Sequence, residues 1–315
     1  MAICKNPYIP RSQLPASCGK CMPCLVNRKQ LWTHRIMLES RLNDYNSFVT
    51  LTYDDENIPV NHRGIPNLEP DDLQKFLKRL RYYYDKKIRY YAVGEYGTAG
   101  SRGLNPHFHL CIFGMGEEKA NLVQKAWQER GFTLTGTLTP QSAAYVAGYV
   151  QKKTQYNKDM YLEYEIRPEF SRMSTRPGIG YGVVKKIADI CRKDPNVLTP
   201  AGDVPTVLKH GKRTLPLGRY LREQIRIELD MDRTETDIIC EKTGEIKERT
   251  YWHAKELQKE VYKAELQDMQ KDAKGNPKIH QDATSSLKRL IQEKHKQDYI
   301  KFDFKQDLLR KEKVL

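Results

Sequence analysis

Pro106-His107-Phe108-His109-Leu110 is the stretch that decides the fold of this 315-residue chain. Its two histidines flank one bulky apolar residue, and alternate side chains of a β-strand point to the same face of the sheet. We therefore predict a strand from His107 to Gly114 that presents both imidazoles on one face and turns Phe108 into the core. Two imidazoles on one strand can hold a divalent metal ion.

A carboxylate upstream of this strand completes a candidate ligand set. Ile88 to Gly94 is predicted as a strand, and Glu95 follows it directly. Together with His107 and His109, Glu95 would leave coordination positions open for phosphate oxygens and water. We expect Mg²⁺ or Mn²⁺, of which Mn²⁺ accepts imidazole more readily. The alternatives are a histidine pair satisfied by hydrogen bonds in the core and a Glu95 that pairs with a nearby arginine.

Two tyrosines lie four positions apart in Tyr145-Val146-Ala147-Gly148-Tyr149. The sequence predicts a helix that opens at Pro140 and ends near Thr154, and residues four apart on a helix share a face. A phenol with an ordinary pKa of about 10 is a poor nucleophile unless a metal or a lysine favours the phenolate. Lysines within helical reach of Tyr149 could stabilise it or a phosphate, namely Lys152 and Lys153. Two tyrosines at this spacing are otherwise most often structural.

The composition favours a nucleic-acid partner. The chain has 54 Lys+Arg against 40 Asp+Glu and a formal net charge of +14, and an excess of this size attracts polyanions. Two basic clusters are candidate DNA contacts: Lys75, Lys78, Arg79 and Arg81 on a predicted helix, and Lys209, Lys212, Arg213, Arg219 and Arg222. No segment has the ~18 consecutive apolar residues of a membrane span, and the N-terminus has no apolar signal core. We therefore expect a soluble, cytosolic protein with no membrane partner.

Four of the seven cysteines lie within the first 24 residues, at Cys4, Cys18, Cys21 and Cys24. In a reducing compartment such a cluster indicates a metal site rather than disulfides. We predict a structural zinc site with four thiolate ligands. The spacing leaves two alternatives open, an iron–sulfur cluster and unligated thiols in a flexible N-terminus.

Three ordered motifs resemble those of the HUH rolling-circle replication endonucleases: Phe48-Val49-Thr50-Leu51-Thr52-Tyr53, Pro106-His107-Phe108-His109-Leu110, and Tyr145 to Lys153. The two-tyrosine form resembles the replication initiation proteins of small single-stranded DNA phages. Three further motifs resemble in particular the gokushovirus branch of the microviruses: Cys18 to Cys24, Gly94-Glu95-Tyr96-Gly97, and Arg176-Pro177-Gly178-Ile179-Gly180. The similarity covers roughly residues 1–185.

The resemblance implies an enzyme that nicks the origin strand of DNA and later rejoins it. A metal polarises the scissile phosphate, one tyrosine attacks and becomes joined to the 5′ end, and the freed 3′-hydroxyl primes a host polymerase. The second tyrosine then attacks the regenerated origin, and the first linkage is resolved into a closed circle. The partners implied are single-stranded and origin DNA, a host polymerase and a host helicase, in the cytoplasm of a bacterium. Family members often carry a basic residue where this chain has Gly148, which leaves Tyr145 without an adjacent lysine, so we prefer Tyr149 as the first nucleophile.

The order of predicted elements indicates an α+β fold. A helix is predicted from Leu25 to Tyr45, and from residue 48 strands and helices follow as strand, helix, strand, strand, helix, strand, helix. This order predicts an antiparallel sheet with packed helices, whereas Phe170 to Gly180 is predicted as a loop with local turns. We expect a Cys-rich zinc segment at 1–24, an HUH endonuclease core at 25–155, an extension with a basic cluster at 156–249 and a charged helical tail at 250–315.

Two other functions are consistent with the same residues. A histidine-dependent nucleotidyl hydrolase typically needs a third histidine two residues on, where this chain has Cys111. A zinc-stabilised DNA-binding or packaging protein would use the histidine pair structurally and would have no nuclease activity.

Overall fold

The computed structural model describes Cys4, Asn6, Pro7 and residues 16–97, 104–149, 161–199, 202–211, 213–231, 237–239 and 246–248. The backbone divides into two compact units, one spanning Arg28–Val183 and the other combining Met1–Asn27 with Val184–Leu315. Several residues singled out by the sequence lie outside the described part: Lys152, Lys153, Lys212, Cys240 and the tail at 250–315.

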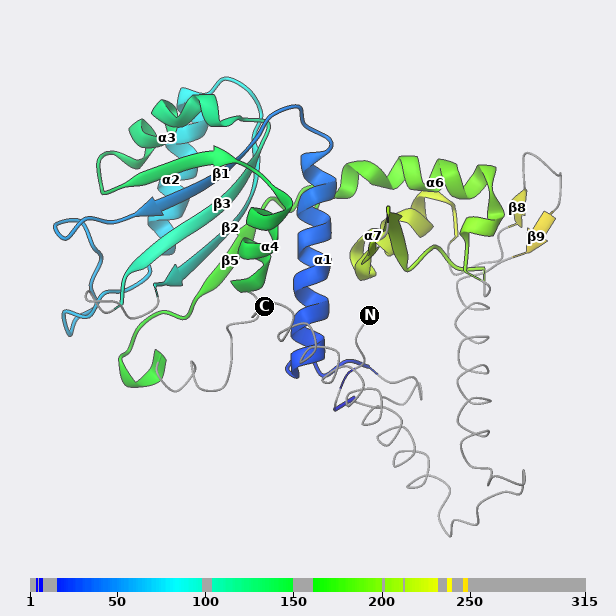
Figure 1. Cartoon of the computed structure of the whole chain (residues 1–315), viewed down its shortest axis with the longest axis horizontal. Coiled ribbons are helices and arrows are strands. Elements are labelled where there is room, and N and C mark those ends of the chain that lie inside the picture. Colours follow the sequence, from blue (N-terminus) through cyan, green and yellow to red (C-terminus); the bar gives the residue numbers. More distant parts are fainter. Residues whose placement is uncertain are drawn as a thin grey trace, which may run out of the picture. The chain divides into compact units, whose positions relative to one another are not determined.

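A five-stranded antiparallel sheet forms the centre of the first unit (Figure 1). Its strands run in the spatial order β4-β1-β3-β2-β5, with these bounds: β1 Asn46–Thr52, β2 Arg89–Tyr96, β3 Pro106–Phe113, β4 Thr133–Thr137 and β5 Phe170–Met173. The histidine-bearing strand β3 lies in the middle, paired with β1 on one side and β2 on the other. The predicted α+β fold with an antiparallel sheet is confirmed.

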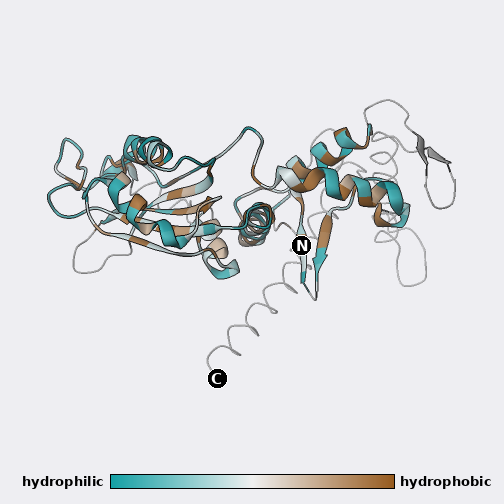
Figure 2. Cartoon of the chain, turned by 90° about the horizontal axis from the view of Figure 1, so that it is seen from above, coloured by the Kyte–Doolittle hydropathy of each residue, from teal (hydrophilic) through white to brown (hydrophobic). Residues whose placement is uncertain are grey.

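Helices cover both faces of this sheet. On one face lie α2 (Pro70–Tyr83) and, after the short 3₁₀ turn η1 (Glu117–Lys119), α3 (Ala120–Trp127). On the other lie α4 (Pro140–Gly148) and the part of α1 (Met22–Ser40) from residue 28 onward. Hydrophobic and hydrophilic positions are interspersed along the strands and around the helices, as expected for elements that each bury one side (Figure 2).

Each face has its own hydrophobic core, and β3 contributes to both by alternation. Phe108 and Leu110 pack with α2 and α3, whereas Cys111 and Phe113 pack with α1 and α4. His107 and His109 lie on the α4 side, because they are an odd number of residues from Phe108. The alternation therefore aims both imidazoles at the helix that carries the two tyrosines.

Strand β5 corrects one expectation. Phe170 begins an edge strand that pairs antiparallel with β2, where the sequence predicts a loop. A four-residue strand is too short to show a clear alternation, and its pairing partner lies far away in the sequence. A Cβ added at Gly94 would lie 2.8 Å from the ring of Phe170, so glycine in β2 gives this edge strand its space.

The second unit contains two helices and two short hairpins. Their bounds are α6 Val184–Lys193 and α7 Gly218–Glu228, with η3 Tyr181–Val183 and η4 Pro195–Val197 as 3₁₀ turns, and hairpins of β6 Val207–His210 with β7 Arg213–Pro216 and β8 Asp237–Ile239 with β9 Ile246–Glu248. Arg222 forms an ion pair with buried Asp203 and is not a free surface cation, contrary to its place in the predicted basic cluster. Among the described helices, none is long and apolar enough to cross a membrane.

Candidate metal centre and tyrosine pair

Glu95, His107 and His109 converge on one point. The register of β2 and β3 places Glu95 directly opposite His107, and its Oε1 lies 2.8 Å from Nε2 of His107 and 3.0 Å from Nε2 of His109. One ligand atom from each residue lies within 4.8 Å of the other two. Glu95 is only 1% exposed, so its carboxylate is held away from bulk water.

The far side of each imidazole is fixed by a hydrogen bond. Nδ1 of His107 lies 2.9 Å from the carbonyl oxygen of Asn105. Because a carbonyl oxygen only accepts, Nδ1 carries the hydrogen, and Nε2 of the neutral ring presents a lone pair to Glu95. Nδ1 of His109 lies 2.9 Å from Oγ1 of Thr50, its partner across β1 and β3. Such contacts behind metal-binding histidines orient their rings.

This donor set fits a divalent cation. A neutral His107 and an ionised Glu95 turn lone pairs toward each other at hydrogen-bond distance, so a proton or a cation must lie between them. Two imidazole nitrogens and one carboxylate oxygen suit Mn²⁺, and also Mg²⁺ with additional water ligands. Three protein ligands leave room for oxygens of a substrate.

Helix α4 delivers two phenols to the same point. It begins with a capping box between Thr139 and Ser142 and with Pro140 in its first turn. The ring of Tyr145 lies 5.1 Å from that of His109, and the ring of Tyr149 lies 5.9 Å from it. The two tyrosine rings are 5.0 Å apart, so both hydroxyl-bearing side chains flank one imidazole.

The two tyrosines differ in environment. Tyr145 is 48% exposed, whereas Tyr149 is 8% exposed. Burial raises the pKa of Tyr149 well above its ordinary value, and its hydrogen bond to Tyr145 and the negative charge of Glu95 raise it further. Tyr149 therefore keeps its proton at neutral pH, and a cation beside Glu95 would oppose the electrostatic part of this effect.

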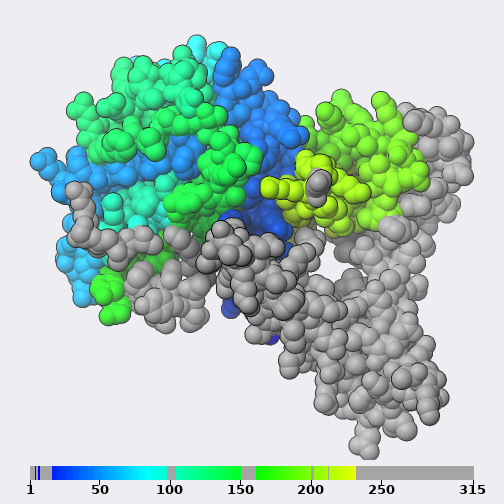
Figure 3. Space-filling view, viewed as in Figure 1, coloured from blue at the N-terminus to red at the C-terminus, as the bar shows by residue number. Residues whose placement is uncertain are grey.

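The structure also brings in Lys29, which the sequence analysis did not select. A Cβ added at Gly148 would lie 3.5 Å from Nζ of Lys29, so an ammonium from α1 lies where a side chain from α4 is missing. Figure 3 shows α1 in blue against the green of α4. The absence of a side chain at position 148 is the one sequence signal for this neighbour, because the two residues are far apart along the chain.

A cavity of about 350 Å³ adjoins Tyr149. The residues that line it are Arg28, Trp32, Val93, Tyr149, Glu169, Phe170 and Ser171. It combines aromatic walls, a cation and the buried carboxylate of Glu169. The sequence analysis missed Glu169, because nothing in the local pattern predicts that β5 joins the sheet beside the metal centre.

The other candidates behave differently from one another. The four cysteines meet in the second unit, with ligand atoms within 4.8 Å. In the α2 cluster, Lys75, Lys78 and Arg81 are exposed, but Nε of Arg79 donates to the carbonyl oxygen of Ala126, 2.7 Å away. Arg79 thus ties α2 to α3 and is a structural residue.

Comparison with known proteins matches these features. A family model that describes replication-associated proteins of the ORF2 type covers residues 46–154, from β1 to just beyond α4. Replication-associated protein ORF2 of Spiroplasma virus 4 is 32% identical over 283 residues, which cover 84% of this chain and 83% of that protein. The chain belongs to the microvirus replication-associated proteins.

Two further microvirus replication-associated proteins share a shorter part of the chain. ORF4 of Chlamydia phage 1 is 32% identical over 162 residues, covering 44% of this chain and 38% of its own length. VP4 of Bdellovibrio phage phiMH2K is 31% identical over 170 residues, covering 47% and 51% respectively. No solved structure matches the chain. The predicted microvirus replication initiator is thus confirmed at the level of the family.

Proposed function

We propose that this replication initiator is a metal-dependent endonuclease and strand transferase that nicks the origin strand by tyrosine attack. The observation that carries the proposal is the meeting, around His109, of a three-ligand site for a cation with two phenol rings 5.1 and 5.9 Å from its imidazole. Positioned nucleophiles beside a site with open coordination positions are what phosphoryl transfer to an enzyme side chain requires.

In the first step, Tyr149 gives up its phenolic proton and its oxygen bonds to the scissile phosphorus. The bond from phosphorus to the 3′ oxygen breaks, that oxygen takes up a proton, and the 5′ phosphate stays joined to Tyr149. When bound, Mg²⁺ or Mn²⁺ supplies Lewis-acid polarisation of the phosphate and favours the phenolate. Because Tyr149 is buried beside Glu95, its deprotonation depends on a positive charge in the site.

The exposed tyrosine serves the second step. Tyr145 attacks the regenerated origin, and the 3′-hydroxyl released there attacks the phosphotyrosine of Tyr149. This attack restores a phosphodiester and frees the phenol of Tyr149, so the displaced strand becomes a closed circle. The 5.0 Å separation of the two rings supports this alternation, because both phenols can reach one phosphate.

Groups around the tyrosines would hold the DNA strand. Lys29 beside Gly148 lies where its ammonium can balance the charge of the phosphate. The cavity next to Tyr149 would receive a base flanking the nick, stacked on Trp32 or Phe170. Lys152 and Lys153 remain proposed helpers on the sequence argument alone. The 3′-hydroxyl left by the nick would serve a host polymerase, with a host helicase to separate the strands.

The proposal is tested by incubating the protein with labelled single-stranded origin DNA and Mn²⁺, followed by denaturing electrophoresis. We expect a covalent protein–DNA band that disappears with EDTA and in the His107→Ala/His109→Ala variant. Retarded migration in native gels alone would instead support a DNA-binding or packaging protein without nuclease activity, and would overturn the proposal.

A further inference from the structure

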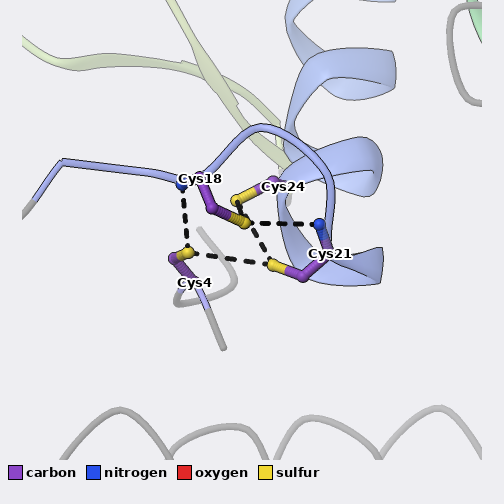
Figure 4. Close-up of side chains that lie close together, drawn as sticks. All are labelled: Cys4, Cys18, Cys21 and Cys24. Carbon is purple, nitrogen blue, oxygen red and sulfur yellow. Dashed lines mark hydrogen bonds between the residues drawn. The ribbon is translucent and has the colours of Figure 1, made fainter. Parts of the chain in front are cut away.

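Four cysteine side chains from two segments of the second unit point toward one another (Figure 4). Cys18 and Cys21 lie in the turn before α1, Cys24 lies in the first turn of α1, and Cys4 comes from the preceding segment. Their sulfur atoms are 4.0 Å apart for Cys18–Cys24, 3.8 Å for Cys4–Cys21 and 3.4 Å for Cys21–Cys24. All four carry thiols rather than disulfides in the described part of the chain.

These distances match a tetrahedral ion and exclude a disulfide. Zinc binds thiolate sulfur at about 2.3 Å, and a tetrahedron with this bond length places its corners about 3.8 Å apart. A disulfide requires sulfurs about 2.05 Å apart. The three measured separations lie around the tetrahedral value, so the space between the sulfurs suits one metal ion.

The backbone around the sulfurs favours negative charge. The N–H of Cys18 donates to Sγ of Cys4 at 3.3 Å, and those of Lys20 and Cys21 donate to Sγ of Cys18 at 3.5 and 3.4 Å. Gly19 adopts a left-handed φ of 74°, which turns the following N–H groups back toward Cys18. The first turn of α1 contains no acidic residue, so the positive end of the helix is free to favour thiolates.

We propose that Cys4, Cys18, Cys21 and Cys24 bind one Zn²⁺ as a structural site independent of the nuclease centre. Four protein ligands fill a tetrahedral ion and leave no position for substrate, which distinguishes structural zinc from catalytic zinc. The ion ties the segment around Cys4 to the start of α1. Metal affinity therefore becomes stability of this part of the fold.

The test is elemental analysis of the full-length protein purified without chelator. We expect about one zinc per chain, and about a tenfold or greater loss of zinc in Cys18→Ser and Cys24→Ser. The matched control is Cys191→Ala, which removes a buried cysteine of the same unit that lies outside the cluster and should keep the zinc. The His107→Ala/His109→Ala variant should also keep it, which separates this site from the nuclease centre.

A second measurement covers the case in which the serine variants do not fold. Wild-type protein loaded with Co²⁺ should show the charge-transfer and ligand-field absorption of a tetrahedral cobalt–thiolate site, and added Zn²⁺ should abolish it. Iron with acid-labile sulfide, a disulfide found by mass spectrometry, metal-free protein that binds no Co²⁺, or zinc retained by folded serine variants would each overturn the proposal.

Discussion

Glu95 is the residue on which metal binding depends most. Its buried carboxylate faces both histidines, and we expect Glu95→Gln to weaken Mn²⁺ binding by at least the ~10–100-fold that loss of an outer-shell partner costs at a metal site. Isothermal titration with Mn²⁺ measures this directly. The matched control is Glu169→Gln, another buried carboxylate outside the ligand set, and equal loss in both variants would contradict the assignment.

Lys29 offers a test by relocation of a charge. We expect Lys29→Met to slow adduct formation by about tenfold, equivalent to about 1.4 kcal/mol of transition-state stabilisation. Adding Gly148→Lys should restore the rate, because the nearest atom to a Cβ at this position is 3.5 Å away and the side chain can be accommodated.

Lys78→Met removes an exposed lysine of α2 and is the control for the loss of charge alone. Single-turnover nicking assays compare the three proteins. Unchanged nicking by Lys29→Met, or a failure of the double variant to recover, would show that the ammonium does not act on the reaction.

The capping box of α4 connects local helix stability to the position of the tyrosines. Thr139→Ala removes the side chain that accepts from the N–H of Ser142, and we expect a loss of about 1 kcal/mol in unfolding free energy together with slower nicking. Gln141→Ala, an exposed change in the same turn, should alter neither. Urea unfolding and the nicking assay measure both effects, and an unaffected Thr139→Ala would mean that the cap does not position α4.

The elements near the site are those that the sequence predicts best. Strand β3 and the start of α4 are predicted to within a residue, because the His-Phe-His alternation and Pro140 are strong local signals. The helix predicted from Glu117 to Arg130 instead ends at Trp127, since Gln128 and Glu129 adopt left-handed backbone angles. Local patterns carry no information on such an ending without glycine.

What the sequence could not predict depends on contacts between distant segments. Strand β5 is defined by its pairing with β2, and Lys29 reaches Gly148 only because α1 and α4 pack on the same face of the sheet. The motifs therefore predict the ligands and the nucleophiles. The groups that surround them, such as Glu169 and Lys29, require the fold.

The stability of the molecule also depends on charges far from the nuclease centre. Burial of Asp203 would raise its pKa, but hydrogen bonds and ion pairs with Arg226 and Arg222 outweigh this and lower the pKa. The stabilisation is present above the ordinary aspartate pKa of about 4 and is lost as the pH falls through the lower pKa of the folded state.

We therefore expect Asp203→Asn to lose about 3–5 kcal/mol of unfolding free energy at pH 7, and the difference from wild type to narrow as the pH is lowered below about 4. Urea unfolding over this pH range measures the effect. Asp189→Asn, which breaks a surface pair with Arg192, should cost at most about 1 kcal/mol. A difference that grows toward acid pH would contradict this reasoning.

The most direct measurement of the proposed chemistry is mass spectrometry of the trapped protein–DNA adduct formed with Mn²⁺ and single-stranded origin DNA. We predict a 5′-phosphate ester on Tyr149 in the wild-type protein, loss of the adduct in Tyr149→Phe, and an initial adduct retained in Tyr145→Phe. Abundant adduct in Tyr149→Phe, or no covalent product from wild-type protein that has bound Mn²⁺, would contradict the proposal that the buried phenol beside Glu95 attacks first.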